Sequence, residues 1–285
     1  MIYNAPIQDM LFLTREWIGM DRITSLPGFE EVDADLIEAV LEEAGKFASS
    51  ELLTINREGD EHGAVYSDGT VTTPPGFKEA YKNFIEAGWT SIDASPDHGG
   101  QGLPKLLQSL IDEILGATNV AFKLYTELSR GAYHCMAHAA SDEICDKYLP
   151  KLVEGVWSGT MCLTEPHCGT DLGMIRTKAE PQEDGTYRIT GQKIWISAGE
   201  HDMSENIIHM VLAKIDDGEG VEAGSRGISL FLVPKFLLDE NGRPALRNVI
   251  EISGLNHKMG QRGIVNTVPV LGGDSQDFFD GGFKP

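Results

Sequence analysis

Residues 161–171 (MCLTEPHCGTD) are the first of two short segments whose groups could bind a flat polar heterocycle. A strand candidate runs into residues 164–166 (TEP) and then into a turn at residues 169–171 (GTD). Such a turn offers main-chain N–H groups and two hydroxyls within a short span, which suits a ring with polar edges and a phosphate. A turn whose Thr and Asp side chains only satisfy their own backbone would show the same pattern.

The second segment, residues 191–197 (GQKIWIS), follows about 25 residues later. Alternation along a strand places Lys193, Trp195 and Ser197 on one face and the two isoleucines on the other. A Trp and a hydroxyl on one face can stack on a ring and hydrogen bond to its edge at the same time. A strand Trp that covers the protein core is the alternative interpretation.

Together, at this spacing, the two segments resemble the acyl-CoA dehydrogenase family, FAD enzymes that desaturate acyl-CoA thioesters. The resemblance extends over about residues 80–265, and it includes HGGQG, YLPKLVEG, TYRITGQKIWIS, GISLFLVPK and HKMGQRG. The N-terminal extension and the VTTPPGFKEAYKNFIEAGW stretch are similar to the longer branch of the family, which includes 3-methylmercaptopropionyl-CoA dehydrogenase.

The resemblance implies a set of cofactor-binding residues: Met161, Cys162, Leu163, Thr164, Thr170, Trp195, Ile196 and Ser197. Residues 161–164 would contact the flavin through main-chain groups and the Thr164 hydroxyl. Trp195 would cover one face of the isoalloxazine, and Ser197 would bond to the edge near N5. Thr170 would meet the cofactor phosphates or the substrate. Cys168 and Met174 stand where the family has small residues, which puts close packing of the turn in question.

The family reaction also needs a carboxylate that removes the α-proton of the thioester, and the resemblance places that Glu in a helical domain after the β domain. We therefore expect no catalytic base within these residues, no C-terminal helical bundle, and a truncated homologue that binds FAD weakly or not at all and lacks turnover. The resemblance further implies electron-transfer flavoprotein as the electron acceptor and a homo-oligomer, a dimer or tetramer.

Two other functions stay open at this point. One is an acyl-CoA oxidase or another flavoenzyme on the same scaffold, and the other is a non-catalytic interaction protein that retains the fold. His134 and His138 lie at a spacing that can bind zinc on a helix, with Cys135 between them. No third ligand is evident, so the pattern favours helix packing or pocket lining, and we expect no metal.

The elements that must hold the two segments divide the chain into an α+β order. We expect an extension over residues 1–32, an all-helical domain over 33–155, a mainly antiparallel β barrel or sandwich over 156–270, and an irregular tail over 271–285. The last twenty residues show no periodic run that could complete a core.

Several helices and strands can be placed within these domains. Asp35 and Glu38 predict a helix start, and Pro74-Pro75 a second one that ends near Gly88. A stripe over residues 106–115 predicts a third helix, and shorter helical pieces follow over 120–125, 131–140 and 142–153. The strand candidates are TYRITG, KIWIS, IIHMVLAKI and GISLFLVP.

The composition excludes several partners. The chain has 285 residues, with 23 Lys and Arg against 44 Asp and Glu, a net charge of −21 that argues against nucleic acid and against a polybasic membrane anchor. The acidity is concentrated in residues 1–150, which hold 25 acidic and 10 basic side chains. With no apolar run of membrane-spanning length, no signal-peptide pattern and four cysteines without a CxxC pair, we expect a cytoplasmic protein. The family resemblance implies a role in fatty acid metabolism.

Overall fold

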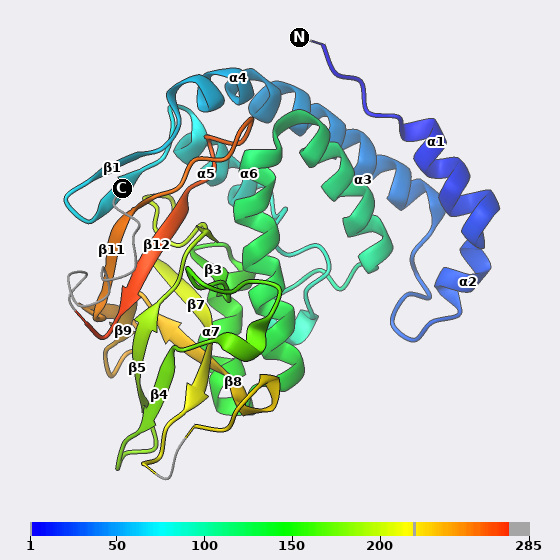
Figure 1. The fold of residues 1–285 in the computed structure, drawn as a ribbon. Coiled ribbons are helices and arrows are strands. Elements are labelled where there is room, and N and C mark those ends of the chain that lie inside the picture. The colour runs from blue at the N-terminus through cyan, green and yellow to red at the C-terminus, as the bar shows by residue number, and fades with distance from the viewer. Residues whose placement is uncertain (1, 219–220, 274–285) are drawn as a thin grey trace.

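Helices form the first half of the chain and strands most of the second, in the α+β order predicted from the sequence (Figure 1). The computed structural model describes residues 2–218 and 221–273. The longer elements of the helical half are α1 (Ile7–Phe12), α2 (Met20–Thr24), α3 (Ala34–Phe47), α4 (Leu53–His62), α5 (Phe77–Glu86), α6 (Lys105–Ala139) and α7 (Asp142–Val153). Between α4 and α5 lies a short hairpin of β1 (Val65–Ser67) and β2 (Thr70–Thr72), which the sequence analysis did not contain.

The first long helix, α3, begins two residues earlier than the sequence pattern predicted. Asp33, not Asp35, is its N-cap, since the Asp33 carboxylate accepts from the main-chain N–H of Leu36 at 2.7 Å. The apolar stripe behind this cap is buried as expected, with Ile37 and Leu41 in the helical core.

The predicted pieces between residues 105 and 140 form one long element, α6, with a kink at Asn119. There the backbone leaves helical geometry, at φ −155° and ψ 86°. The Asn119 side chain accepts from the main-chain N–H of Phe122 and donates to the carbonyl of Leu52. One side chain thus caps the second part of α6 and ties it to the preceding helices.

The strands form an eight-stranded, mainly antiparallel sheet in the order β11-β12-β5-β4-β7-β3, with β6 paired to β12 and β8 to β7. Its members are β3 (Trp157–Cys162), β4 (Lys178–Pro181), β5 (Tyr187–Gln192), β6 (Ile196–Ser197), β7 (Asn206–Ile215), β8 (Ile228–Pro234), β11 (Ile250–Leu255) and β12 (Asn266–Leu271). The β3–β7 and β4–β7 pairs are parallel. Thr160 of β3 donates to the Ser197 carbonyl of β6, so the sheet returns on itself as a nearly closed barrel.

The strand β12 corrects one expectation. We expected no core-forming run in the last twenty residues, yet β12 lies inside the sheet, with Asn266, Thr267, Val270 and Leu271 buried. The segment lacks alternation because its polar residues are buried as well as its apolar ones. Of the predicted irregular tail, residues 274–285 lie outside the described residues.

The two halves are joined through α6 and through a segment that returns from the sheet. Gly159 of β3 lies against α6, where its N–H donates to the Ser129 hydroxyl at 3.1 Å. Residues 262–265 reach back to the helices: Ile264 and Val265 are buried in the helical core, and the Tyr125 hydroxyl bonds to the main chain at residues 263 and 265. Any site beside β3 is therefore fixed by both halves.

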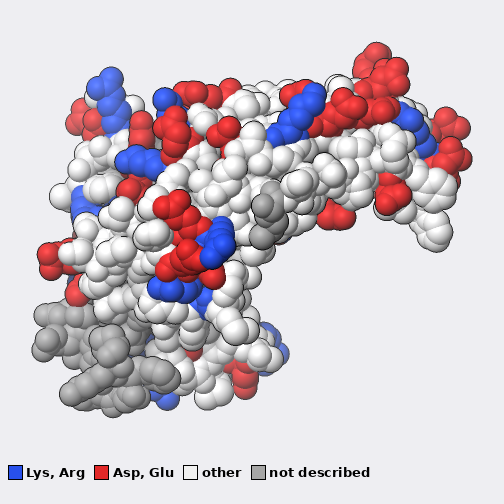
Figure 2. Space-filling model, turned by 90° about the horizontal axis from the view of Figure 1, so that it is seen from above, with Lys and Arg blue, Asp and Glu red and all other residues white. Residues whose placement is uncertain are grey.

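Acidic side chains gather over the N-terminal helices, in line with the charge asymmetry of the sequence (Figure 2). The exposed ones on this part of the chain are Asp9, Glu16, Asp21, Glu30, Glu31, Asp33, Asp35, Glu42 and Glu43. They face solvent on the helices and on the turn between α2 and α3.

Candidate functional site

An open cleft of about 360 Å³ lies where the two segments singled out in the sequence meet. Its volume lies within the usual range of small-molecule sites. The main-chain N–H of Ile194 donates to the carbonyl of Thr164 at 2.9 Å and so joins the two walls. The lining residues are Thr164, Glu165, Pro166, His167, Cys168, Gly169, Ile194, Trp195 and Asn256.

Trp195 has the most unusual conformation in this cleft. Its φ is 61°, in the left-handed region that bulky residues rarely occupy, and its side chain is 44% exposed. The predicted strand over residues 193–197 is therefore wrong. Only Ile196 and Ser197 pair, and Lys193 is fully buried instead of sharing a face with Trp195. The turn of the backbone leaves a large apolar ring half-exposed on the cleft wall, beside buried neighbours on both sides.

Strand β3 leads into the opposite wall and contributes mainly its main chain. Met161 is exposed although the rest of β3 is buried. Cys162 points inward, and burial raises the pKa of its thiol to about 12, so it stays protonated. Leu163 is half-buried, and its carbonyl accepts from the ammonium of Lys193 at 3.1 Å. A ligand at this wall would meet Cys162 only through backbone atoms.

The turn after Thr164 is tightly closed, although Cys168 and Met174 stand where the resemblance implies small residues. Glu165 and Cys168 exchange main-chain hydrogen bonds of 2.9 and 3.1 Å. Cys168 is buried in the turn, while Met174 is exposed and its carbonyl bonds to the His167 ring at 2.9 Å. Thr170 lies exposed just beyond the turn and does not line the cleft.

Ser197 lies behind Trp195 and is held by two buried partners. Its hydroxyl donates to the side-chain oxygen of Asn266 at 2.8 Å, and its carbonyl accepts from Thr160. The lone pairs of the Ser197 oxygen remain able to accept from a ligand N–H. Asn266, which the sequence analysis missed, is fully buried.

Asn256 is a second residue of the cleft that sequence reasoning missed. It lines the cleft, and its side-chain nitrogen is buried without a hydrogen-bond partner. An unpaired buried donor is unfavourable by about 1–3 kcal/mol, so this amide is placed to donate to an acceptor on a bound molecule. Its position directly before the HKMGQRG segment was the one available signal.

Among the described residues that line the cleft, Glu165 is the one carboxylate, and it is fully engaged. It accepts from the Lys193 ammonium at 2.9 Å, from the Thr177 hydroxyl and N–H, and from the Arg176 N–H. Burial raises the pKa of Glu165, but the charge of Lys193 and these hydrogen bonds outweigh burial and lower it overall. An ionised carboxylate held by four donors is a poor proton acceptor.

Glu165, His167 and Cys168 also bring three metal-binding atoms within 4.8 Å of one another. The Lys193 ammonium already supplies the positive charge beside Glu165, and it would repel an added cation. The group therefore forms a closed turn rather than an open metal site.

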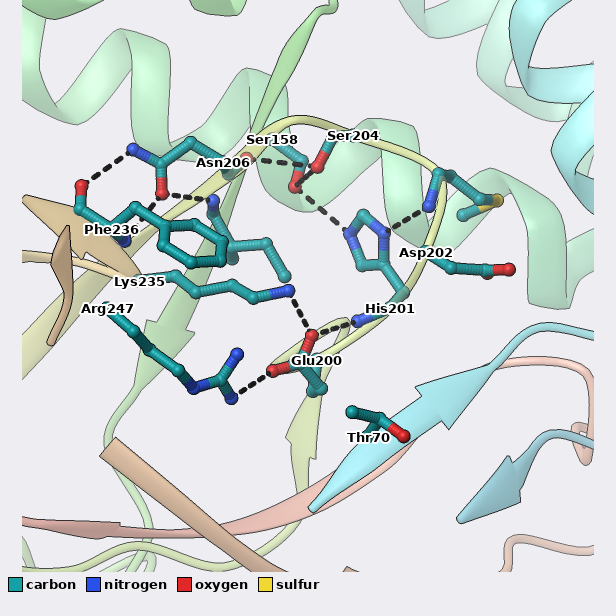
Figure 3. A network of polar contacts seen from close by, with 12 residues as sticks. Thr70, Ser158, Glu200, His201, Asp202, Ser204, Asn206, Lys235, Phe236 and Arg247 are labelled. Carbon is teal, nitrogen blue, oxygen red and sulfur yellow. Dashed lines mark hydrogen bonds and ion pairs between the residues drawn. The ribbon is translucent and has the colours of Figure 1, made fainter. Parts of the chain in front are cut away.

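A second polar cluster lies where the segment after β6 meets α6 and β3 (Figure 3). Its Ser158 hydroxyl lies 3.0 Å from Nε2 of His201, a pairing that resembles a nucleophile and its base. However, Nδ1 of His201 accepts from the main-chain N–H of Met203, so Nε2 carries the proton and donates to Ser158. Burial lowers the pKa of His201 to about 3. The pair is thus a neutral structural link, which continues through Ser204 to the Asn206 carbonyl.

The same cluster holds a buried carboxylate between two cations. Glu200 binds Lys235 through one oxygen and Arg247 through the other, the latter at 2.9 Å (Figure 3). These contacts fix the segment after β6 to β8 and β10 (Pro244–Arg247). The cluster stabilises the barrel next to the cleft, and none of its charged residues lines the cleft.

The two histidines at helical spacing, His134 and His138, have different surroundings. Nε2 of His134 bonds to the buried Asp93 carboxylate at 2.8 Å, while His138 is exposed at the end of α6. Within residues 2–218 and 221–273, none of the helices has the length and apolar character required to cross a bilayer.

Two family models match the chain. The model for the acyl-CoA dehydrogenase N-terminal domain matches residues 35–156, and the model for the acyl-CoA dehydrogenase middle domain matches residues 160–269. Together they cover both halves of the fold described above.

Individual proteins show the same similarity. The 3-methylmercaptopropionyl-CoA dehydrogenase of Ruegeria pomeroyi is 42% identical over 92% of this chain, which corresponds to 44% of that protein. The chain thus spans less than half the length of this curated relative.

Solved structures show the same fold. Butyryl-CoA dehydrogenase from Megasphaera elsdenii superimposes with a TM-score of 0.66 at 24% identity, over 83% of this chain and 55% of that one. An acyl-CoA dehydrogenase from Bacillus anthracis, solved in complex with FAD, gives 0.65 at 23% identity over 85% and 36%.

Proposed function

Because this chain belongs to the acyl-CoA dehydrogenase family through its N-terminal and middle domains, we propose that its cleft binds the isoalloxazine ring of FAD in an enzyme that desaturates acyl-CoA thioesters. The observation that carries the proposal is the half-exposed, left-handed Trp195 opposite the Thr164 turn. Left-handed backbone at a bulky residue persists only where the surrounding structure holds it, and such sites are commonly functional.

The residues of the cleft fit a flavin ring. The half-exposed side chain of Trp195 offers apolar contact to a flat ring, while the unpaired amide of Asn256 offers a donor to its polar edge. An apolar site with a few polar groups is the usual composition of a cofactor pocket. When bound, FAD would supply the hydride acceptor for the β-carbon of the thioester.

The residues of this chain would orient the ring and its surroundings. We propose that Trp195 covers one face of the ring and excludes water from it. The Thr164 hydroxyl and the main chain of residues 161–163 would hold the opposite edge, and Ser197 would form a hydrogen bond with the ring edge near the reactive nitrogen. The exposed Thr170 would reach phosphate groups or substrate at the rim of the cleft.

Proton abstraction needs a different group. Since Glu165 is held ionised by Lys193 and three further donors, we propose that the base is a carboxylate that does not line this cleft. The groups that line this cleft would then not support dehydrogenase turnover without a carboxylate from elsewhere.

The remaining features of the proposal come from the family resemblance. We propose electron-transfer flavoprotein as the electron acceptor and a homo-oligomeric assembly. A cytoplasmic location is supported by four cysteines that all have free thiols.

Titration of FAD into the purified protein tests the proposal. We expect quenching of tryptophan fluorescence on binding, and an FAD affinity about 10-fold weaker for Trp195→Ala, because an aromatic stacking contact contributes about 1.4 kcal/mol. Trp17→Ala is the matched control, since Trp17 is 78% exposed and does not line the cleft. Absence of FAD binding to the parent protein, or equal losses for both variants, would contradict the proposal.

A further inference from the structure

The two walls of the cleft are connected beneath its surface by a buried ion pair. Lys193 is fully buried, the Glu165 side chain is 2% exposed, and the Lys193 ammonium lies 2.9 Å from the Glu165 carboxylate. Glu165 belongs to the Thr164 turn, whereas Lys193 comes two residues before Trp195. We propose that this pair is a positioning device that sets the placement of Trp195 relative to the Thr164 turn and thereby the geometry in which a flavin is held. This inference rests on the proposed function.

The hydrogen bonds around the pair tie three segments together. The Lys193 ammonium donates to the Leu163 carbonyl at 3.1 Å as well as to Glu165. The second oxygen of Glu165 accepts from the N–H of Arg176 at 2.8 Å, and the first also accepts from Thr177 at 2.6 Å. One ion pair thus fixes the end of β3, the start of β4 and the segment before β6.

Stability alone is a poor explanation for such a pair. Taking both charges out of water is unfavourable by several kcal/mol, and well-packed apolar residues of similar volume often stabilise a protein as well or better. The pair restricts the geometry of the segments around it. The Glu165 carboxylate has four donors and the Lys193 ammonium has two acceptors, and few arrangements of these segments allow all of these hydrogen bonds to form.

Trp195 needs this restraint. A left-handed backbone at a non-glycine residue is unfavourable by about 1–2 kcal/mol, so an unrestrained segment would relax to an extended strand. The side chain of Lys193 anchors the chain two residues before Trp195 by its ion pair with Glu165. The main-chain N–H of Ile194 anchors the residue directly before Trp195 by donating to the Thr164 carbonyl. On the other side, β6 pairs Ile196 with Thr267 of β12. With the Lys193 side chain released, only main-chain hydrogen bonds would hold this side of the turn, from the N–H of Lys193 to Pro269 and from that of Ile194 to Thr164.

Three variants of the whole chain test this role: Glu165→Gln, Lys193→Met and the double variant. Each single variant leaves one buried charge unpaired, so we expect both a lower free energy of unfolding and an FAD affinity at least 10-fold weaker. The double variant leaves no unpaired charge and is expected to recover most of the free energy of unfolding. Its FAD affinity should stay weak, because the side-chain connection between the walls is still absent and only the main-chain bond between Ile194 and Thr164 joins them.

Lys235→Met is the matched control. It removes a cation from another buried carboxylate, Glu200, which keeps Arg247 as a partner and does not line the cleft. We expect this variant to lose stability and to keep the FAD affinity of the parent. The inference would be overturned if the double variant recovered its FAD affinity together with its stability. It would also be overturned if the single variants bound FAD within 2-fold of the parent.

A measurement without FAD separates this inference from the proposed function. The fluorescence of Trp195, taken as the difference between each protein and its Trp195→Phe version, reports the environment of the indole directly. We expect its accessibility to acrylamide to change in the double variant and to stay as in the parent in Lys235→Met. If the parent binds no FAD, the proposed function fails and this difference still decides the positioning role; an unchanged Trp195 signal in the double variant would refute it.

Discussion

Acidification from pH 7 to pH 5 is expected to lower the free energy of unfolding of this protein by about 4 kcal/mol. Two fully buried imidazoles, His201 and His209, are the cause, because burial lowers the pKa of each from 6.5 to about 3. Below pH 6.5 the unfolded chain binds protons at both rings and the folded chain does not, so stability is lost as pH falls and each ring contributes about 2 kcal/mol over this interval.

The surroundings of the two rings act mostly in the same direction. The charge of Lys235 lowers both pKa values, Arg247 lowers that of His209 further, and only Asp202 opposes the shift at His201. The lowered pKa of Glu165 adds to the loss in acid, because its ionised form is the one held in the folded state.

Urea unfolding at pH 7, 6 and 5 measures this effect. His209→Gln removes one of the two buried rings and is expected to halve the loss between pH 7 and pH 5. The control is His138→Gln at the exposed end of α6, for which we expect the full loss. A free energy of unfolding that stays constant over this interval would show that the rings are not buried as neutral groups.

Gly159→Ala is expected to lower the free energy of unfolding by about 3 kcal/mol, since overpacking of a tight interior contact is unfavourable by about 1–3 kcal/mol. A Cβ at this position would lie 2.4 Å from the Cβ of Ala132, on the face where α6 packs against β3. Neither element can move away easily, because Gly159 also bonds to Ser129 of α6 and pairs with Ile208 of β7.

The matched control lies on the same helix. Gly131 of α6 has open space around its Cβ position, so Gly131→Ala is expected to raise the free energy of unfolding by up to about 1 kcal/mol through helix propensity. Chemical denaturation of both variants measures the difference. Equal effects at the two positions would mean that α6 and β3 are not in the close contact described here.

The features that the sequence could predict are those that depend on local pattern. The stripe of α3, the second helix after Pro74-Pro75 and the strands β5, β7 and β8 follow directly from periodicity. The adjacency of residues 164–169 and Trp195 could also be inferred, because a resemblance to a known family connects segments that are distant along the chain.

The features that it could not predict depend on buried polar groups. Lys193 belongs to a strand-like alternation, but its ammonium is satisfied inside the protein by Glu165, so the segment turns and Trp195 takes a left-handed conformation. Likewise the sequence around Asn119 did not predict the kink in α6, because the Asn119 side chain is buried with a partner in Leu52. The sequence of β12 did not predict a core strand, because Thr267 is buried with a partner in Ile196. A periodicity argument uses only the positions of apolar residues and does not predict hydrogen bonds between buried polar groups.

The return of residues 262–265 into the helical core makes the division at residue 155 a division of sequence only. A fragment that ended there would leave uncovered the helix surface on which Ile264 and Val265 lie, and a fragment that began there would carry two apolar side chains with no core to enter. Exchange of one half for that of a relative would therefore require matched partners on both sides of this contact. The two domains are expected to be inherited and to evolve as a unit, and chimaeras joined near residue 155 should aggregate unless residues 262–265 come from the same parent as the helices.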